Sequence, residues 1–190
     1  MKLQAATIAV LLCASGAAAA AQQIDLSLNS DTALLRYTLP ISYSTSGRTD
    51  ADFGLLHTES NDPLLMAGIT MLGEAGSQVP GLDGGVGFRA YGISMDNGAD
   101  IGAVTLGGML KYVPPALNRV GLVAALNYAP NVTVTGDANR LWDFTVRAEY
   151  EVLPMAAVYI GYRDVGVRME INSRDITLDQ GAHFGLRMSF

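Results

Sequence analysis

Apolar and polar residues alternate along most of this 190-residue chain, and the alternation is clearest from residue 141 to residue 152. One parity of this segment holds Trp142, Phe144, Val146, Ala148, Tyr150 and Val152. The other parity is polar except at its first position, and holds Leu141, Asp143, Thr145, Arg147, Glu149 and Glu151. A period of two predicts a β-strand, and its length is about twice the usual five or six residues. Long strands with an aromatic residue near each end are typical of strands that cross a membrane.

Weaker alternation recurs before and after this segment and predicts ten strands in all. We expect them at residues 23–29, 32–41, 51–58, 63–72, 84–95, 100–113, 118–129, 140–152, 155–169 and 181–190. Lipid offers no partner to an unpaired backbone group, so strands that cross a membrane must close on themselves. The sequence therefore predicts an all-β protein, a closed antiparallel transmembrane β-barrel of about 10 strands. Eight strands are the alternative, because the first and third segments are short.

The two parities give the two faces of the predicted barrel. We expect the apolar parity to face lipid, with Trp142, Phe144, Val146, Tyr150, Val158, Ile160, Tyr162, Phe184 and Leu186 among its members. On the polar parity we expect a charge cluster in the lumen, formed by Asp143, Arg147, Glu149, Glu151, Arg163 and Arg187. Small barrels are filled by side chains, so these acids and bases are expected to pair and plug the lumen. The alternative is a narrow polar pathway for ions or small solutes.

The predicted connections differ in length at the two ends of the barrel. Pro114-Pro115 and Pro154 mark short turns, because proline does not fit inside a closed ladder. Residues 96–98, 131–139 and 170–180 are longer and polar, and we expect them on the extracellular side. Short periplasmic turns opposite longer extracellular loops are typical of outer-membrane barrels.

The first 21 residues are expected to be a cleaved signal peptide, which leaves residues 22–190 as the barrel. Lys2 gives a thin positive region, an apolar run follows, and three alanines end at Ala21. A retained N-terminal anchor is the alternative. The only cysteine, Cys13, falls inside this segment, so a disulfide framework and a cysteine-rich zinc site are both excluded.

Composition removes several other classes of protein. Hydrophobic residues make up 49% of the chain and charged residues 16%, which is too apolar for a disordered chain. No apolar run after the N-terminal segment approaches the ~20 residues of a spanning helix. The formal net charge of −6 argues against nucleic-acid binding. We expect no cofactor and no metal site.

The end of the chain carries an expected assembly signal. His183, Gly185, Met188 and Phe190 follow the pattern of a polar residue, a glycine, and apolar residues at the third-last and last positions. This ending resembles the signal read by the barrel-assembly machinery of bacterial outer membranes, where an unpaired strand serves as a template for strand addition. An exported β-sandwich that happens to end in phenylalanine is the alternative.

Several short glycine-aromatic motifs resemble the YfaZ family of small proteobacterial outer-membrane proteins. They are Gly84-Gly85-Val86-Gly87-Phe88, Ala148-Glu149-Tyr150, Val158-Tyr159-Ile160-Gly161-Tyr162-Arg163 and the Gly185 to Phe190 ending, and residues 22–82 match least well. The resemblance implies a small barrel in the outer membrane of a Gram-negative cell. It implies no established activity and supplies no catalytic residues.

For function we expect a structural or narrow-pore role, a monomer, and contact with outer-membrane lipids and lipopolysaccharide. A channel for ions or small solutes is one alternative. A barrel enzyme acting on lipid or peptide is another, since His57 lies near Glu59 and Asp62 in the sequence. The parity of His57 and Thr58 prevents their side chains from meeting, so we expect no enzyme activity. The polar segment 170–180 is a candidate partner-binding loop, but its acids match no calcium-loop spacing.

Overall fold

The computed structural model describes residues 22–45, 47–59, 63–74, 79–94, 100–170 and 174–190. Almost all of them lie in strands, which are β1 (Gln23–Leu28), β2 (Thr32–Ser44), β3 (Gly47–Thr58), β4 (Leu64–Glu74), β5 (Leu82–Ser94), β6 (Asp100–Tyr112), β7 (Val120–Ala129), β8 (Val134–Gly136), β9 (Ala138–Leu153), β10 (Ala156–Met169) and β11 (Asp175–Ser189). The expected signal peptide, the expected loop at 96–98 and Asp62 lie outside the described residues. No helix in the described part is long and apolar enough to cross a membrane.

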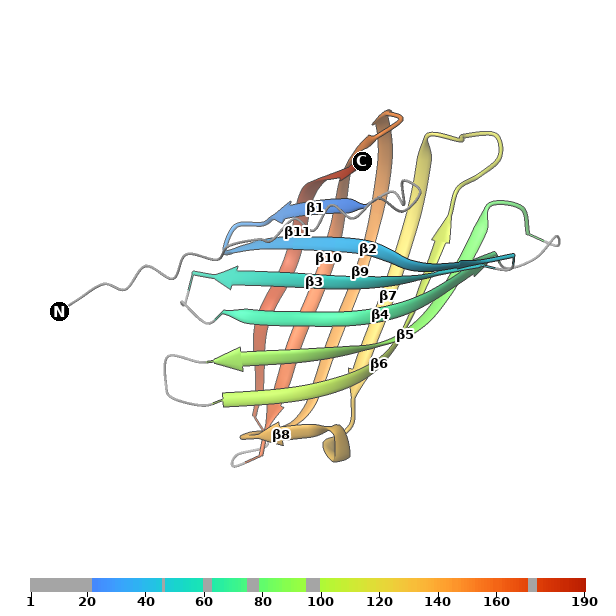
Figure 1. The fold of residues 1–190 in the computed structure, drawn as a ribbon. Helices are drawn as coiled ribbons and strands as arrows, with labels where there is room; N and C mark the ends of the chain where they lie inside the picture. The colour runs from blue at the N-terminus through green and yellow to red at the C-terminus, as the bar shows by residue number, and fades with distance from the viewer. Residues whose placement is uncertain (1–21, 46, 60–62, 75–78, 95–99, 171–173) are drawn as a thin grey trace.

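The strands form a closed antiparallel barrel (Figure 1). Ten strands complete the circle, in the order β1, β2, β3, β4, β5, β6, β7, β9, β10, β11 and back to β1. The short strand β8 pairs with Ile101–Ala103 of β6, beyond the stretch of β6 that pairs with β7. β8 therefore lies beside β6 in line with β7, and it does not add an eleventh strand to the circle. The prediction of ten strands is confirmed, and the alternative of eight is wrong.

The first and last strands of the barrel pair with each other and close the circle. Residues 23–28 pair with residues 189–184, and the main chains of Gln22 and Phe190 exchange two hydrogen bonds of 2.9 and 3.0 Å. We call this end of the barrel the terminal end and the opposite end the distal end. The connections after β2, β4, β6 and β9 lie at the terminal end, and those after β1, β3, β5 and β10 lie at the distal end.

Three predicted segments prove to be wrong in extent. Residues 175–180 belong to β11 and are not loop, and the connection after β10 is correspondingly short. A β-bulge at Val165 and Gly166 shifts the register, so that Leu178 and Asp179 are both buried and the alternation of the sequence is lost. The expected loop 131–139 holds a 3-10 turn (Asn131–Thr133), β8 and the start of β9. The third strand begins at Gly47, four residues earlier than expected.

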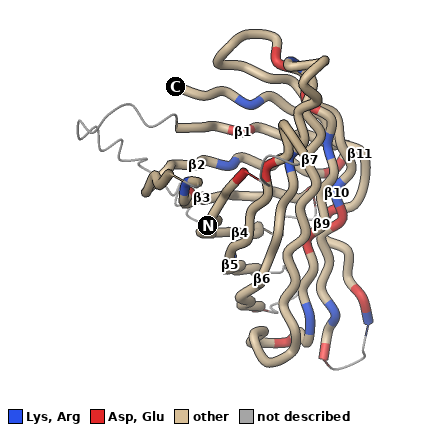
Figure 2. The backbone as a smooth tube through the Cα atoms, turned by 90° about the vertical axis from the view of Figure 1, so that its right-hand side faces the viewer, with Lys and Arg blue, Asp and Glu red and all other residues tan. Residues whose placement is uncertain are grey.

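The outer surface of the barrel is apolar on every side. Phe53 on β3, Val86 and Phe88 on β5, Leu106 on β6 and Ile160 on β10 are each more than half exposed. Charged side chains of the long strands are instead mostly on the inward parity. Figure 2 marks the positions of the charged residues along the backbone. The barrel thus has an apolar outer face and a partly polar interior, the reverse of a soluble protein.

Candidate functional site in the lumen

The lumen is filled by apolar side chains at its distal end. We call this set the distal apolar cluster; its members are Leu34, Leu56, Leu64, Met66, Tyr91, Ile93, Ile101, Ala103, Ala129, Val134, Ala138, Leu141, Val165, Val167 and Leu178. They come from every strand of the circle except β1, and Leu56, Leu64, Leu141 and Val167 are at most 1% exposed. Because these inward side chains are buried on strands all round the circle, they fill the distal end of the lumen.

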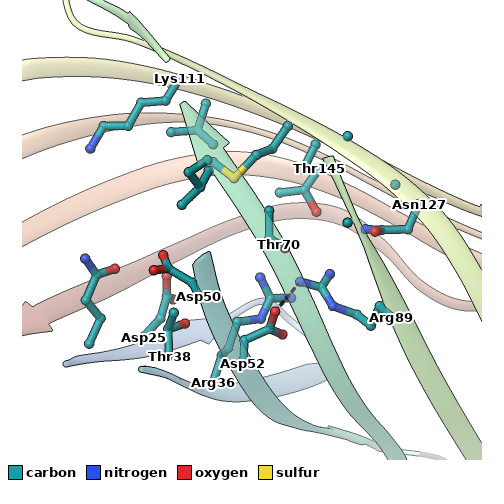
Figure 3. A pocket seen from close by; sticks show the side chains of 18 of the residues that line it. Asp25, Arg36, Thr38, Asp50, Asp52, Thr70, Arg89, Lys111, Asn127 and Thr145 are labelled. Atoms are coloured by element: carbon teal, nitrogen blue, oxygen red, sulfur yellow. Dashed lines mark hydrogen bonds and ion pairs between the residues drawn. The ribbon is translucent and has the colours of Figure 1, made fainter. Parts of the chain in front are cut away.

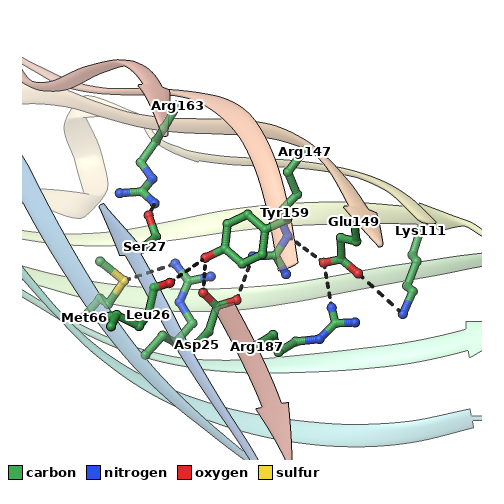
Figure 4. Close-up of polar contacts among 11 residues, drawn as sticks. Asp25, Leu26, Ser27, Met66, Lys111, Arg147, Glu149, Tyr159, Arg163 and Arg187 are labelled. Atoms are coloured by element: carbon green, nitrogen blue, oxygen red, sulfur yellow. Dashed lines mark hydrogen bonds and ion pairs between the residues drawn. The ribbon is translucent and has the colours of Figure 1, made fainter. Parts of the chain in front are cut away.

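A layer of ion pairs follows in the middle of the lumen, and Asp25 is at its centre (Figure 4). Arg147 Nη1 on β9 lies 2.7 Å from Asp25 Oδ2 on β1. The Tyr159 hydroxyl on β10 donates to the other carboxylate oxygen of Asp25, and the Arg147 guanidinium lies 4.5 Å from the centre of the Tyr159 ring. One carboxylate therefore joins three strands, with charge-assisted contacts on both of its oxygens.

Glu149 serves as the shared acid for three cations toward the terminal end. Its carboxylate lies 2.6 Å from Arg187 Nη1, 2.8 Å from Arg147 Nε and 4.0 Å from Lys111 Nζ. The Glu149 side chain is only 4% exposed, so these pairs are protected from screening by salt. One acid shared among three bases leaves this side of the lumen with a local excess of positive charge.

A second buried pair links β10 and β11 nearer the distal end. Arg163 Nη1 lies 2.8 Å from Asp179 Oδ2, with side chains 6% and 0% exposed. Arg163 also donates to Ser27 Oγ at 2.5 Å, and Asn29 donates to Asp179 Oδ1 at 2.6 Å. The pair is thus completed by two polar partners from the beginning of the chain, which is what a buried ion pair requires.

A third cluster joins β3 and β5 to β9. Arg89 Nη2 lies 3.0 Å from Asp52 Oδ1, and Arg89 Nη1 lies 3.8 Å from Asp143 Oδ2. The Tyr91 hydroxyl donates to Asp143 at 2.6 Å. A side chain at Gly68 would meet Asp52 and Arg89, so the glycine makes room for this pair.

Arg36 differs from the other arginines of the lumen. Its Nη2 donates to Met66 Sδ at 3.4 Å, its buried Nε has no hydrogen-bond partner, and no carboxylate of the described chain lies within ion-pair distance of it. Figure 3 shows Arg36 beside Asp52 and Arg89. The positive charge of Arg36 is therefore balanced only at longer range, by acids that are already paired with other bases.

A cavity of about 170 Å³ lies between these clusters, on the terminal side of the distal apolar cluster (Figure 3). Its lining combines charged residues such as Arg36, Asp50 and Lys111 with the neutral polar groups of Thr70 and Asn127. The volume corresponds to about five or six waters at ~30 Å³ each and is smaller than the ~300–1,000 Å³ of drug-sized ligand sites. Water or a very small solute fits, and a large substrate does not.

The structure brings five of the six expected lumen charges into these clusters. Asp143, Arg147, Glu149, Arg163 and Arg187 are joined by the contacts above, while Glu151 is exposed near the terminal end and makes no ion pair among the described residues. The sequence reasoning missed the other polar residues of the lumen, which are Asp25, Arg36, Asp50, Asp52, Arg89, Lys111, Tyr91, Tyr159 and Asp179. The only sequence signal for the partners on β1–β6 is a few charges on the inward parity of otherwise apolar or glycine-rich strands.

The nine expected lipid-facing residues all lie on the outer face. Eight are exposed, and Trp142 is half-buried because its ring covers Gly166 and its indole N–H donates to Asp164 at 3.1 Å. Of the expected assembly signal, Met188 and Phe190 are exposed on the outer face. His183 and Gly185 face the lumen, where His183 packs edge-on against Tyr159 with ring centres 5.9 Å apart.

The geometry around His57 gives little support for a catalytic role of this residue. His57 is exposed on the outer face of β3, whereas Thr58 next to it is buried on the inner face. Within the described residues, no three His, Cys, Asp or Glu side chains gather as metal ligands. The polar groups of this chain are concentrated in the lumen, and that is where a functional site has to be sought.

These features define a class of protein, a small closed β-barrel with an apolar outer face and a plugged, ion-paired interior. The family model described as YfaZ precursor matches residues 1–190, so the chain belongs to the YfaZ family, as the short motifs had suggested. A comparison with curated proteins finds no match.

A search of solved structures finds matches of low sequence identity. The KdgM porin is 12% identical, with a TM-score of 0.49, over 90% of this chain and 99% of that chain. OmpT of Vibrio cholerae, expressed in the outer membrane, is 13% identical, with a TM-score of 0.41, over 88% of this chain and 64% of that chain. Likenesses of this degree say nothing about the solutes or partners of this chain.

Proposed function

We propose that this protein is an integral, monomeric outer-membrane barrel whose lumen is closed to solutes, with a structural role in the membrane. Export through a cleaved signal peptide and insertion by the barrel-assembly machinery belong to the proposal. The terminal end would face the periplasm and the distal end the outside. The observation that carries the proposal is the distal apolar cluster, which fills the distal end of the lumen.

Membrane insertion is supported by the outer face. Apolar side chains there are exposed all round the barrel, and burying them in lipid is worth about 25 cal/mol per Å². A contiguous apolar surface of this extent is not found on monomeric soluble proteins. Each of the ten strands of the circle pairs with a neighbour on both sides, as hydrocarbon requires, and only the short strand β8 at the distal end pairs on one side.

Closure of the lumen rests on two successive barriers. At the distal end an ion would have to cross a dry apolar layer, which acts as a gate by excluding water. In the middle, the paired groups of Asp25, Arg147 and Tyr159 join β1, β9 and β10. A hydrated ion would have to break these contacts to pass.

Planar-bilayer recordings of the purified protein test this proposal, and we expect conductance to be small or absent. The triple variant Leu56→Ala, Leu64→Ala and Leu141→Ala should give measurable current steps, because it removes the bulk of the distal layer. The matched control is Leu65→Ala, the exposed neighbour of Leu64, which should stay silent. Stable channels of porin size in the unmodified protein would contradict the proposal.

A narrow ion passage is the second candidate, favoured by the charged cavity on the terminal side. In that case the unmodified protein would give small current steps whose ion selectivity changes in Arg36→Gln. An enzyme is the third class, and we propose no catalytic role for His57. Loss of a lipid or peptide hydrolysis in His57→Ala would overturn that judgement.

A further inference from the structure

The outer face near the distal ends of β9, β10 and β11 departs from the apolar character of the rest. Arg140 on β9, Arg168 on β10 and Asp175 on β11 are neighbours in register across the three strands. Arg140 is exposed, and the side chains of Arg168 and Asp175 are 36% and 53% exposed. Figure 2 shows the basic positions gathered at the lower ends of these strands.

The two arginines oppose each other on β9 and β10, and only Arg168 has an acidic neighbour, Asp175 on β11. Arg168 Nε lies 2.9 Å from Asp175 Oδ1, whereas Arg140 has no ion pair with any described residue. Like charges directly opposite on antiparallel strands destabilise the pairing, since their Cβ atoms are about 4.5–5.5 Å apart. An anion from outside the chain would remove this repulsion and supply Arg140 with the partner that it lacks.

The position of the pair on the barrel indicates which anion this is. Arg140 lies two residues beyond Trp142 on the same face, or about 7 Å along the strand. Trp142 itself donates to Asp164, and below it Phe144, Tyr162 and Phe184 continue the apolar face. Indole rings with one polar end mark the boundary between hydrocarbon and headgroups, which places both guanidinium groups at the headgroup level.

Acidic residues lie both within and beyond this sector. Asp31, Glu59 and Asp100 lie elsewhere at the distal end, whereas Asp137 and Glu170, whose main chains are joined by a hydrogen bond of 2.9 Å, lie at the distal ends of β9 and β10. A third arginine, Arg174, is exposed immediately before β11. The exposed arginines described at the distal end are therefore all in the β9–β11 sector, and none of its acids forms an ion pair with Arg140.

We propose that Arg140, Arg168 and Arg174 form a site for the phosphate groups of a phosphorylated glycolipid, the lipopolysaccharide of the outer leaflet. The inference rests on the proposed outer-membrane orientation. Arginine forks bind phosphate oxygens in pairs, and two adjacent guanidinium groups at the headgroup level match a phosphate fixed to a lipid. Free inorganic phosphate could form the same contacts with the arginines, but it lacks the lipid that holds the phosphate at the membrane surface.

The test uses the full-length barrel inserted into vesicles of neutral phospholipid, with and without added lipid A. The variant is Arg140→Gln with Arg168→Gln, and the control is Arg119→Gln, an exposed arginine at the terminal end. We expect native mass spectrometry to show lipid A retained by the unmodified protein and the control, and at least a tenfold loss of retention in the variant. Millimolar inorganic phosphate should not displace the lipid.

Two outcomes overturn the inference while leaving the proposed function intact. Equal retention by the variant and the unmodified protein would show that the arginines do not hold the lipid. Displacement by inorganic phosphate at equal concentration would show a site for free phosphate only. Insertion is checked in the same vesicles by protection from protease and by the gel shift between unboiled and boiled samples. Failure of insertion would instead contradict the proposed membrane barrel.

Discussion

Tyr159 lies directly opposite Gly185 on the neighbouring strand, and its ring occupies the space that a side chain at Gly185 would take. The Tyr159 hydroxyl passes over this glycine and donates to Asp25 on the next strand along. One side chain therefore spans β10, β11 and β1, across the seam where the first and last strands meet. The glycine of the expected assembly signal thus has a structural reason in the closed barrel.

Gly185→Ala should destabilise the folded barrel by about 1–3 kcal/mol, the usual range for overpacking a filled site. A Cβ atom there would overlap the Tyr159 phenol and the main-chain oxygen of Leu26. Urea unfolding in lipid vesicles measures the change. Gly92→Ala is the matched control, because no atom lies within 4 Å of its added Cβ; equal stability loss in both variants would contradict the packing argument.

Arg163→Ala should reduce the free energy of unfolding by about 3–5 kcal/mol, because it leaves Asp179 charged and buried without its cation. Its double variant with Asp179→Leu should recover much of the loss, since both buried charges are then removed. The coupling is measured by a double-mutant cycle of unfolding free energies. If the double variant is no more stable than Arg163→Ala, the loss of stability does not come from the unpaired charge of Asp179.

Tyr91→Phe should cost about 1.5–3 kcal/mol, the value of a hydrogen bond to a charged group. The removed hydroxyl donates to Asp143 at 2.6 Å, where both side chains are about 5% exposed. Tyr128→Phe on the outer face is the comparison, and it should change stability by less than about 0.5 kcal/mol. A smaller loss for Tyr91→Phe than for Tyr128→Phe would mean that Asp143 finds another donor.

Ile160→Arg should destabilise the inserted barrel by about 2–4 kcal/mol, because it places a charge at mid-height on the lipid face. Ile160 is 65% exposed and is flanked on its strand by Val158 and Tyr162 on the same face. Val132→Arg, at the 87% exposed tip of the distal 3-10 turn, should be neutral. If both variants unfold alike in vesicles, the outer face is not in lipid.

The sequence predicted the strand count and the two faces, because alternation survives wherever a strand is regular. It failed where the register shifts: the bulge at Val165 and Gly166 puts Leu178 and Asp179 on the same side and disguises the start of β11. Where a strand begins or ends near a bulge depends on how it pairs with its neighbour, and the sequence of one strand alone does not show that pairing.

The candidate site was predicted only in part, for a related reason. On β9 and β10 many charged residues alternate regularly with apolar residues, so the sequence predicted that Arg147 and Glu149 face the lumen. Their partners Asp25 and Lys111 are single charges in apolar strands far away in the sequence. The pairing of acids with bases depends on which strands come together when the barrel closes, and the residue pattern within one strand does not contain this information.

The pairing of β1 with β11 has a consequence for how the protein is made. These strands are the first and last of the barrel, so the circle gains its final hydrogen bonds only between residues separated by nearly the whole chain. Such contacts carry the largest loop-closure entropy and form late. Any folding intermediate in which β1 and β11 are not yet paired leaves these two strand edges open, and open edges favour aggregation until the circle closes.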